Sequence, residues 1–382
     1  MVSAGVSSIA LPWLVLDHGG SSTEAGLIFA LSVFPYVVFG LPAGVIGDRH
    51  SRQKVMWLSH ACQMLAALVI PIWAFAEGQP PLWIVLGAAF AIGTARVFVD
   101  AAVFGAIAAI IGREHFTQGQ ATLSAAWAMG YFAGPAIGGI LIGFIGPAFT
   151  LLVEAAGFAL AFLLILLIRR NLDAENRGSP EPAVAMMKEG LAVIWQTPKV
   201  RGYTWVSIAW NLAAAASAAV LVPLLRDTLG LTSLKAGIVL GVGAVIGIVV
   251  PSALGRLVPR FGPGRVTAVT TAVSGAAILA SGLAPGFASV TAANAARSFC
   301  DFALISTIIG ERQKGVPNRL QARVGISGRM IAVGAISAGA AIGSLLSEPV
   351  GVRGVFVISA VGVAIAFAFT IPRVLRLDRE AR

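Results

Sequence analysis

Four charged residues lie in otherwise apolar parts of the chain, and they occur as two pairs with the same spacing. Arg96 precedes Asp100 by four residues in one apolar run, and Arg297 precedes Asp301 by four residues in another. A charge inside a membrane costs free energy, so it commonly marks a transport pathway or a neutralising pair. A carboxylate beside a cation can also exchange a proton when its surroundings change. We therefore treat these four residues as candidate transport and coupling residues.

Each pair also has a purely structural interpretation. An arginine and an aspartate four residues apart on a helix can neutralise each other, although arginine before aspartate is the weaker order for such a pair. That order favours charges that face across a cavity, and both interpretations stay open. Two other carboxylates in or beside apolar runs, Asp17 and Glu154, are lesser candidates for the same role. Asp17 also suits an interfacial position.

Aromatic and amide side chains in the apolar runs offer contacts for an amphipathic solute. The candidates for such a substrate cavity are Trp127, Tyr131, Trp210 and Asn211, although helix packing explains buried aromatic residues equally well. The two cysteines and four histidines have no spacing that suits a metal ion. The chain contains no Gly-x-x-x-x-Gly-Lys-Ser/Thr loop, which argues against ATP as its energy source. We expect no metal and no cofactor.

Composition places these residues in a membrane. Hydrophobic residues make up 57% of the 382 positions and charged residues only 12%, whereas soluble domains carry about a quarter charged residues. The net charge of +10 does not indicate a nucleic-acid partner, because the basic residues lie in short segments between apolar runs without interleaved aromatics. At about 20 residues per span, the chain has room for about twelve transmembrane helices.

The apolar runs predict an all-α membrane protein, because only a helix satisfies its own backbone polar groups in lipid. The first run is shorter than a span requires, so we expect a truncated first helix. The predicted spans are 2–17, 25–47, 55–76, 82–111, 119–143, 147–168, 202–225, 234–258, 266–284, 287–309, 323–346 and 353–371.

Lysine and arginine crowd one alternate set of loops, whereas the other set holds only Arg226, Lys235 and Arg353. The positive-inside rule then places the crowded loops and both termini in the cytoplasm, with the chain in the inner cell membrane. A short amphipathic helix is expected at 186–195, within the central loop. The predicted parts are an N-terminal six-helix bundle at 1–168, a cytoplasmic loop at 169–200, a C-terminal six-helix bundle at 201–372 and a cytoplasmic tail at 373–382.

An internal repeat relates the two bundles. Thr94–Asp100 reads TARVFVD, and Ala295–Asp301 reads AARSFCD 201 residues later. Gln120-Ala121 and Gln321-Ala322 keep the same offset. The repeat indicates two pseudo-symmetric halves related by an axis along the membrane normal. The charged pairs of the two halves would then lie at similar depth near that axis.

A loop between the second and third spans carries a recognisable pattern, Gly44-Val45-Ile46-Gly47-Asp48-Arg49-His50-Ser51-Arg52-Gln53-Lys54. It resembles the signature loop of the major facilitator superfamily, with Ser51 in place of the usual glycine. A basic cytoplasmic loop would explain Arg49, Arg52 and Lys54, but not Gly44 and Asp48 at their spacing. Gly44 would allow close helix approach, and Asp48 could oppose a helix N-terminus. Arg49 and Arg52 could hold nearby acidic or carbonyl groups.

The span 119–143 contains a second pattern, Gly130-Tyr131-Phe132-Ala133-Gly134-Pro135-Ala136-Ile137-Gly138-Gly139. It is similar to Gly-x-x-x-Gly-Pro-x-x-Gly-Gly, the motif of the antiporter branch of the superfamily. Gly130, Gly134 and Gly138 form one smooth helix face, so ordinary helix packing is the alternative explanation. Pro135 permits a kink.

Within the superfamily the chain looks most like the macrolide-efflux and enterobactin-exporter branch, through Leu11–Asp17 and Leu41–Gly44. The family motif in the fourth span would supply Arg96, but it has a glycine where this chain has Asp100. The resemblance implies a monomeric drug:proton antiporter that exports small amphipathic molecules by alternating access. The alternatives are an uptake permease of the same fold and a transporter-like sensor without flux. An enzyme is disfavoured, because no cluster of nucleophiles lies at one membrane face.

Overall fold

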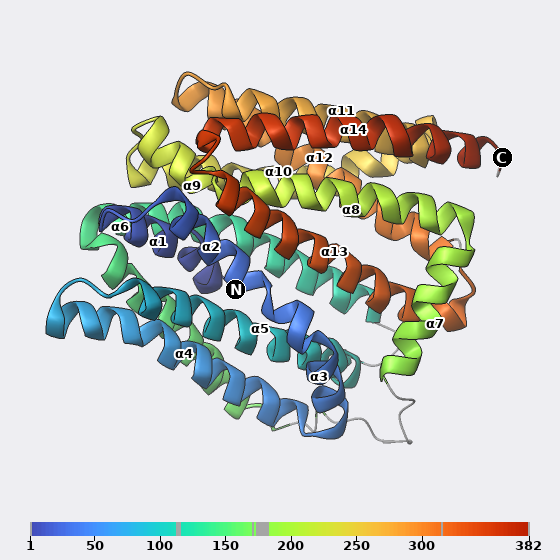
Figure 1. Ribbon diagram of the computed structural model, residues 1–382. Helices are drawn as coiled ribbons and strands as arrows, with labels where there is room; N and C mark the ends of the chain where they lie inside the picture. The colour runs from blue at the N-terminus through green and yellow to red at the C-terminus, as the bar shows by residue number, and fades with distance from the viewer. Residues whose placement is uncertain (1, 112–115, 170–171, 173–182, 315, 381–382) are drawn as a thin grey trace. The chain divides into compact units, whose positions relative to one another are not determined.

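The computed structural model describes the chain except residues 1, 112–115, 170–171, 173–182, 315 and 381–382 (Figure 1). Every element in this described part is a helix, which confirms the predicted fold class, and each predicted span falls on one helix or on consecutive helices. The chain forms two compact units. The first comprises Met1–Ala183 and Thr232–Gly241, and the second comprises Val184–Leu231 and Val242–Arg382.

The first unit is built from the helices α1 to α6. A capping box starts α2, because Ser21 Oγ accepts a hydrogen bond from the Glu24 N–H at 3.2 Å and the Ser21 N–H donates to the Glu24 carboxylate at 2.8 Å. The predicted span 25–47 breaks before Pro35, which lacks an N–H and suits the first turn of α3. The bounds are α1 Val2–Asp17, α2 Ser22–Val33, α3 Pro35–Arg49, α4 Arg52–Glu77, α5 Leu82–Ile111 and α6 Phe116–Leu166.

The helix α6 contains two predicted spans in two arms, 116–145 and 147–166. Its backbone turns at Gly146, with φ 77° and ψ 163°, a conformation that residues with a Cβ rarely adopt. The break in α6 is therefore at Gly146, and Pro135 lies inside the first arm without non-helical dihedrals. Both α1 and α4 pack along α6.

The second unit is built around α8. Figure 1 shows α8 beside α13 and α14, and α11 beside α12 and α14, in agreement with their contacts. Gly339 and Gly343 of α13 contact the backbone of Leu212 and Ala216 of α8, a closeness that only a residue without a Cβ allows. The bounds are α7 Ala183–Gln196, α8 Pro198–Ala219, α9 Leu221–Pro223, the π-helix η1 Leu224–Thr228, α10 Ser233–Phe261, α11 Pro263–Gly282, α12 Phe287–Lys314, α13 Asn318–Leu346 and α14 Gly351–Glu380.

Six helical segments of the described chain are long and apolar enough to cross a membrane, or seven if α8 and its continuation, bent by 42°, count as one span. Shorter apolar helices occur at Gly5–Asp17 and Ser233–Gly243. Large apolar side chains are strongly exposed, among them Phe75 at 86% and Phe144 at 84%. Such side chains fit contact with lipid rather than water.

The last helix is longer than the predicted span. The predicted span 353–371 lies within α14, which continues without a break to Glu380, so the predicted tail, 373–382, is helical as far as that residue. The physical reason is local: the residues after Pro372 are leucine, arginine, valine, aspartate and glutamate, none of which breaks a helix as proline or glycine would.

The helix predicted at 186–195 is present as α7, which spans Ala183–Gln196 and packs on α13. Gly190 lies against the backbone of Arg323, and Glu189 forms an ion pair with the Arg323 guanidinium. Ser327 Oγ donates a hydrogen bond to the Met187 carbonyl at 3.1 Å. The loop 169–200 therefore contains a helix fixed to the second unit.

Candidate transport and coupling site

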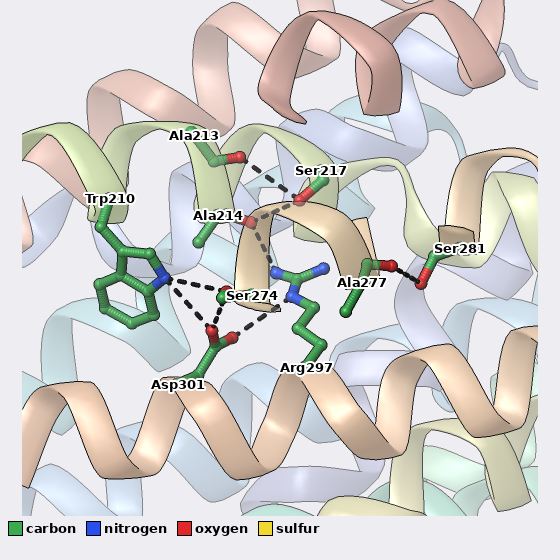
Figure 2. Close-up of polar contacts among 9 residues, drawn as sticks. All are labelled: Trp210, Ala213, Ala214, Ser217, Ser274, Ala277, Ser281, Arg297 and Asp301. Atoms are coloured by element: carbon green, nitrogen blue, oxygen red, sulfur yellow. Dashed lines mark hydrogen bonds and ion pairs between the residues drawn. The ribbon is translucent and has the colours of Figure 1, made fainter. Parts of the chain in front are cut away.

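In the second unit, the predicted pair Arg297 and Asp301 forms the centre of a polar network between three helices. Figure 2 shows both side chains pointing from α12 toward α8 and α11. Arg297 Nε donates to Asp301 Oδ2 at 3.3 Å, and Arg297 Nη2 donates to the Ala214 carbonyl at 2.8 Å. Asp301 Oδ1 accepts from Ser274 Oγ at 2.6 Å and from Trp210 Nε1 at 3.2 Å.

This network holds a salt bridge in an apolar surrounding. The Arg297 side chain is 8% exposed, whereas the Asp301 side chain is 20% exposed, so the carboxylate is the more accessible partner. Three donors share the two carboxylate oxygens, and charge-assisted hydrogen bonds of this kind are the stronger ones. Arg297 also joins α12 to α8 through Ala214. A change in charge at Asp301 would therefore act on the contact between these two helices.

In the first unit, the repeated aspartate has a different neighbour. Tyr36 of α3 donates a hydrogen bond from its hydroxyl to Asp100 Oδ2 at 2.6 Å. Arg96 is half-buried one turn before Asp100 on α5. The duplicated sequence pattern thus has a tyrosine partner in one half and a serine and a tryptophan in the other.

The two lesser carboxylate candidates differ in burial. Asp17 ends α1 and is exposed, as an interfacial residue would be. Glu154 lies on the second arm of α6, where its relative exposure is 0%. Ser7 of α1 donates a hydrogen bond to Glu154 Oε1 at 2.9 Å.

Two of the four predicted cavity residues, Trp210 and Asn211, have described side chains, and both lie on α8. The side chains of Trp127 and Tyr131 lie outside the described residues. Trp210 is 5% exposed and belongs to the Asp301 network. Asn211 is buried next to it on α8, but its amide nitrogen donates to the Ser207 carbonyl at 2.7 Å within the same helix.

The signature loop, residues 44–54, joins α3 to α4. The side chain of Asp48 lies outside the described residues, and Arg49 and Lys54 are exposed. Arg52 Nη1 donates a hydrogen bond to the Leu172 carbonyl at 3.1 Å. Gln53, which the sequence did not single out, donates to the carbonyls of Ile165 and Ile168 at 2.8 Å each. These bonds satisfy groups at the end of α6.

The close helix approach predicted at Gly44 is not found among the described residues. A Cβ added at Gly44 would meet no atom of them within 4 Å. The glycine of this loop that does face another helix is Gly47, where an added Cβ would lie 3.6 Å from the Ala101 backbone of α5.

The glycines of the antiporter-type motif pack against two different helices. A Cβ added at Gly5 of α1 would lie 2.5 Å from the Gly130 carbonyl oxygen and 2.9 Å from Gly134 Cα. Gly138 continues the same face, since its added Cβ would lie 3.2 Å from the Val6 carbonyl. Gly139 points elsewhere and contacts Gly237 at the start of α10. The motif therefore holds α1 and the start of α10 against the first arm of α6.

A second charged cluster, absent from the sequence-based candidates, lies where α8 begins and α12 ends. Glu311 accepts from Lys199 at 2.7 Å and from Lys314 at 3.1 Å, and its side chain is 4% exposed. Glu311 follows the predicted span 287–309. Burial alone would raise the pKa of Glu311, but the hydrogen bonds and charges of the two lysines outweigh it and hold that pKa below its usual value.

Glu311→Gln should lower the stability of the second unit by about 1–3 kcal/mol at neutral pH, because a buried charge-assisted pair is lost. A carboxylate with a lowered pKa stabilises the fold above its unfolded pKa and loses that effect as the pH falls through its folded pKa. The unfolding temperatures of the wild type and Glu311→Gln, measured in detergent, should therefore differ at pH 7 and converge in acid. Glu348→Gln, at an exposed position, is the matched control. Equal unfolding temperatures at pH 7 would contradict this role of Glu311.

Several contacts of this site have no signal in the sequence. Ser274, Tyr36 and Ser7 are ordinary small or aromatic residues in apolar helices, and their importance comes from the helix that each one faces. Each of them lies far along the sequence from the charged residue that it contacts, and no regular spacing relates the two. Only the tertiary packing identifies them as hydrogen-bond donors to carboxylates.

Curated proteins similar to this chain include efflux transporters. The multidrug efflux pump Tap of Mycolicibacterium fortuitum is 30% identical over 209 residues, which cover 52% of this chain and 50% of that protein. Macrolide efflux protein A of Streptococcus pyogenes is 23% identical over 197 residues, which cover 51% of this chain and 48% of that protein. The chain spans about half the length of the curated relatives it matches.

Solved structures of transporters share the fold. A bacterial homologue of the human lysosomal transporter Spinster superposes with a TM-score of 0.77 at 13% identity, over 100% of this chain and 95% of that chain. A bacterial homologue of the iron transporter ferroportin gives a TM-score of 0.68 at 15% identity, over 98% and 95%. At these identities the likeness shows the fold alone. The sequence model of the Major Facilitator Superfamily matches residues 1–324, and the chain therefore belongs to that superfamily of multi-pass membrane proteins.

Proposed function

We propose that this protein is a secondary transporter that exports small amphipathic molecules by alternating access, driven by proton entry. The observation that carries the proposal is the buried network in which Asp301 binds Arg297, Ser274 and Trp210. An ionisable pair inside a membrane helix is a functional candidate, since its burial costs stability. The efflux relatives support the direction of transport and the class of substrate.

The proposed coupling step is a change of charge at Asp301. In the ionised form the carboxylate holds Arg297, which in turn donates to the Ala214 carbonyl of α8. A proton bound at Asp301 removes the negative charge and leaves Arg297 without its anion. The guanidinium released in this way would then favour another arrangement of α8 and α12, or it would bind a substrate that supplies a hydrogen-bond acceptor. Asp100 and Arg96 are proposed to take the corresponding part in the first half.

Transport in sealed, inverted membrane vesicles tests this function directly. An acid-inside pH gradient should drive uptake of lipophilic cations or macrolides into vesicles that contain the protein and not into vesicles without it. An uptake permease would move its solute the other way, and a sensor without flux would move none. Growth of cells with and without expression, on a panel of inhibitors, would then narrow the substrate class.

The orientation follows from the same proposal. Lysine and arginine crowd the loops on one side, so the segment 169–200 and the C-terminus are placed in the cytoplasm of a monomer in the inner membrane. Single cysteines at Ser179 and Asp378, in a variant without Cys62 and Cys300, should resist a charged maleimide added outside intact cells. Both should react after the membrane is opened. Efficient labelling from outside would reverse the orientation.

A further inference from the structure

Glu154 occupies a position in the first unit that the coupling network of the second unit does not use. It lies on the second arm of α6 with a relative exposure of 0%. Its Oε1 atom accepts one hydrogen bond, from Ser7 Oγ of α1 at 2.9 Å. Its Oε2 atom has no hydrogen-bond partner among the described residues. A carboxyl group this deeply buried therefore has a single donor.

The ionised form of Glu154 suits this setting poorly. A carboxylate has two acceptor oxygens that can each take more than one hydrogen bond, and burial of a charge without such partners is much more costly than burial of a neutral polar group. The neutral acid keeps the bond to Ser7 and carries no charge. The geometry therefore favours a carboxylic acid that holds its proton while α1 is packed against α6.

No charged group on the described parts of the neighbouring helices forms a close ion pair with Oε2 of Glu154, so none of them stabilises the ionised form by direct contact. On α5, the guanidinium of Arg96 acts on Glu154 through its charge, and Asp100 lies one turn further along that helix. On α4, His60 stacks on Phe158, one turn from Glu154, and bonds to Gln63 at 2.9 Å.

The remaining charges lie further off along the packed elements. On α1, Asp17 is at the far end of the helix from Ser7 and is exposed. At the start of α10, Lys235 is exposed as well. The field of Arg96 is thus a charge effect that would favour loss of the proton once water reaches the site.

The helix α1 covers Glu154 and keeps water from it. Close backbone contacts at glycines, rather than long side chains, hold α1 against α6. Gly5 lies against Gly130 and Gly134, and Gly138 lies against Val6 and Ile9, so the contacts of α1 fall on both sides of Ser7. A small displacement of α1 would break these short-range contacts together, since dispersion contacts fall off steeply with separation. The same movement would remove the Ser7 hydroxyl from Glu154 and open the carboxyl group to water.

We propose that Glu154, together with Ser7, is a proton-binding site of the first half, loaded while α1 packs on α6 and emptied when α1 moves away. This inference rests on the proposed proton-coupled function and assigns it a second titrating group. The site takes a proton as its ligand, and Ser7 is a positioning residue that supplies the hydrogen bond.

Infrared spectroscopy of the full-length protein in lipid nanodiscs tests the proton directly. At neutral pH the wild type should show the carbonyl stretch of a buried protonated carboxylic acid, and Glu154→Gln should lose that component. Ser7→Ala should keep it but shift it to higher frequency, because the carbonyl loses its hydrogen-bond donor. Glu77→Gln, at an exposed position of α4, is the matched control and should leave the carboxylic-acid component unchanged. An unchanged carboxylic-acid signal in Glu154→Gln would overturn the proposal.

A transport measurement separates this inference from the proposed function. In vesicles, Glu154→Gln should lose the acceleration that a pH gradient gives to drug uptake, while Glu77→Gln keeps it. Wild-type vesicles without any gradient-driven flux would reject the proposed function, and the infrared result would still decide whether Glu154 holds a proton. Full acceleration in Glu154→Gln, with active wild type, would reject the coupling role of Glu154 alone.

Discussion

Asp301→Asn is expected to abolish transport driven by a pH gradient while leaving exchange of substrate down its own gradient. Asparagine can still accept from Ser274 and Trp210, so the packing of α8, α11 and α12 is retained. It cannot neutralise Arg297, whose side chain is 8% exposed. Removal of one member of a buried ion pair costs about 3–5 kcal/mol, much of it from the charge left behind. The measurement compares gradient-driven uptake with counterflow in the same vesicles.

Two further variants make this result decisive. Asp227→Asn breaks a pair of the same chemistry at 3.0 Å, between Arg226 and an aspartate side chain that is 46% exposed, and should change neither activity. The double variant Arg297→Leu with Asp301→Leu removes both charges together. Normal gradient-driven transport by the double variant would mean that the pair only neutralises itself within α12, and the coupling role would be lost.

Gly5→Val is expected to destabilise the first unit and to reduce transport more than any exposed glycine substitution. An added Cβ would lie 2.5 Å from the Gly130 carbonyl oxygen, and both groups belong to helix backbones that cannot turn aside as a side chain can. Overpacking of this kind costs about 1–3 kcal/mol and occasionally more. Thermal unfolding of purified protein and vesicle transport both report the effect.

Gly87→Val is the matched control, because it makes the same change within α5 where an added Cβ meets no described atom within 4 Å. Both substitutions carry the same small change in helix preference. A similar loss of stability in the two variants would show that the α1–α6 contact is not responsible. A loss confined to Gly5→Val would identify the antiporter-type glycines as the attachment of α1.

The sequence predicted the helices well because hydropathy in a membrane is a local property. The spans at 119–143 and 147–168 were separated correctly, although the structure joins them through Gly146. The Arg297–Asp301 spacing left a neutralising pair within one helix and charges facing across a cavity both open, and the structure shows the pair. Hydropathy does not indicate how far the last helix continues beyond the predicted span, and α14 extends to Glu380.

The partners of the charged residues could not be predicted in the same way. Whether Asp301 faces Ser274 or Asp100 faces Tyr36 depends on how each helix is rotated about its axis, and hydropathy is nearly blind to rotation in a helix that is apolar all round. The motif at 130–139 illustrates the same limit. Gly130, Gly134 and Gly138 share one face toward α1, as their spacing predicted, but nothing in the sequence indicates that Gly139 meets α10.

The docking of α7 on α13 determines where this polypeptide can be divided. Although 169–200 reads as one long connection, α7 is fixed by Glu189, Gly190 and Ser327 at one end and Leu172 is held by Arg52 at the other, so the connection between these contacts is confined to residues 173–182. Fully extended, the chain from Leu172 to Ala183 reaches no further than about 40 Å. If the protein is expressed as two fragments, a division before Ala183 keeps α7 in the same fragment as α13, on which it packs. A division after Gln196 would place α7 and α13 in different fragments. Fusion partners and protease sites belong in the same short stretch.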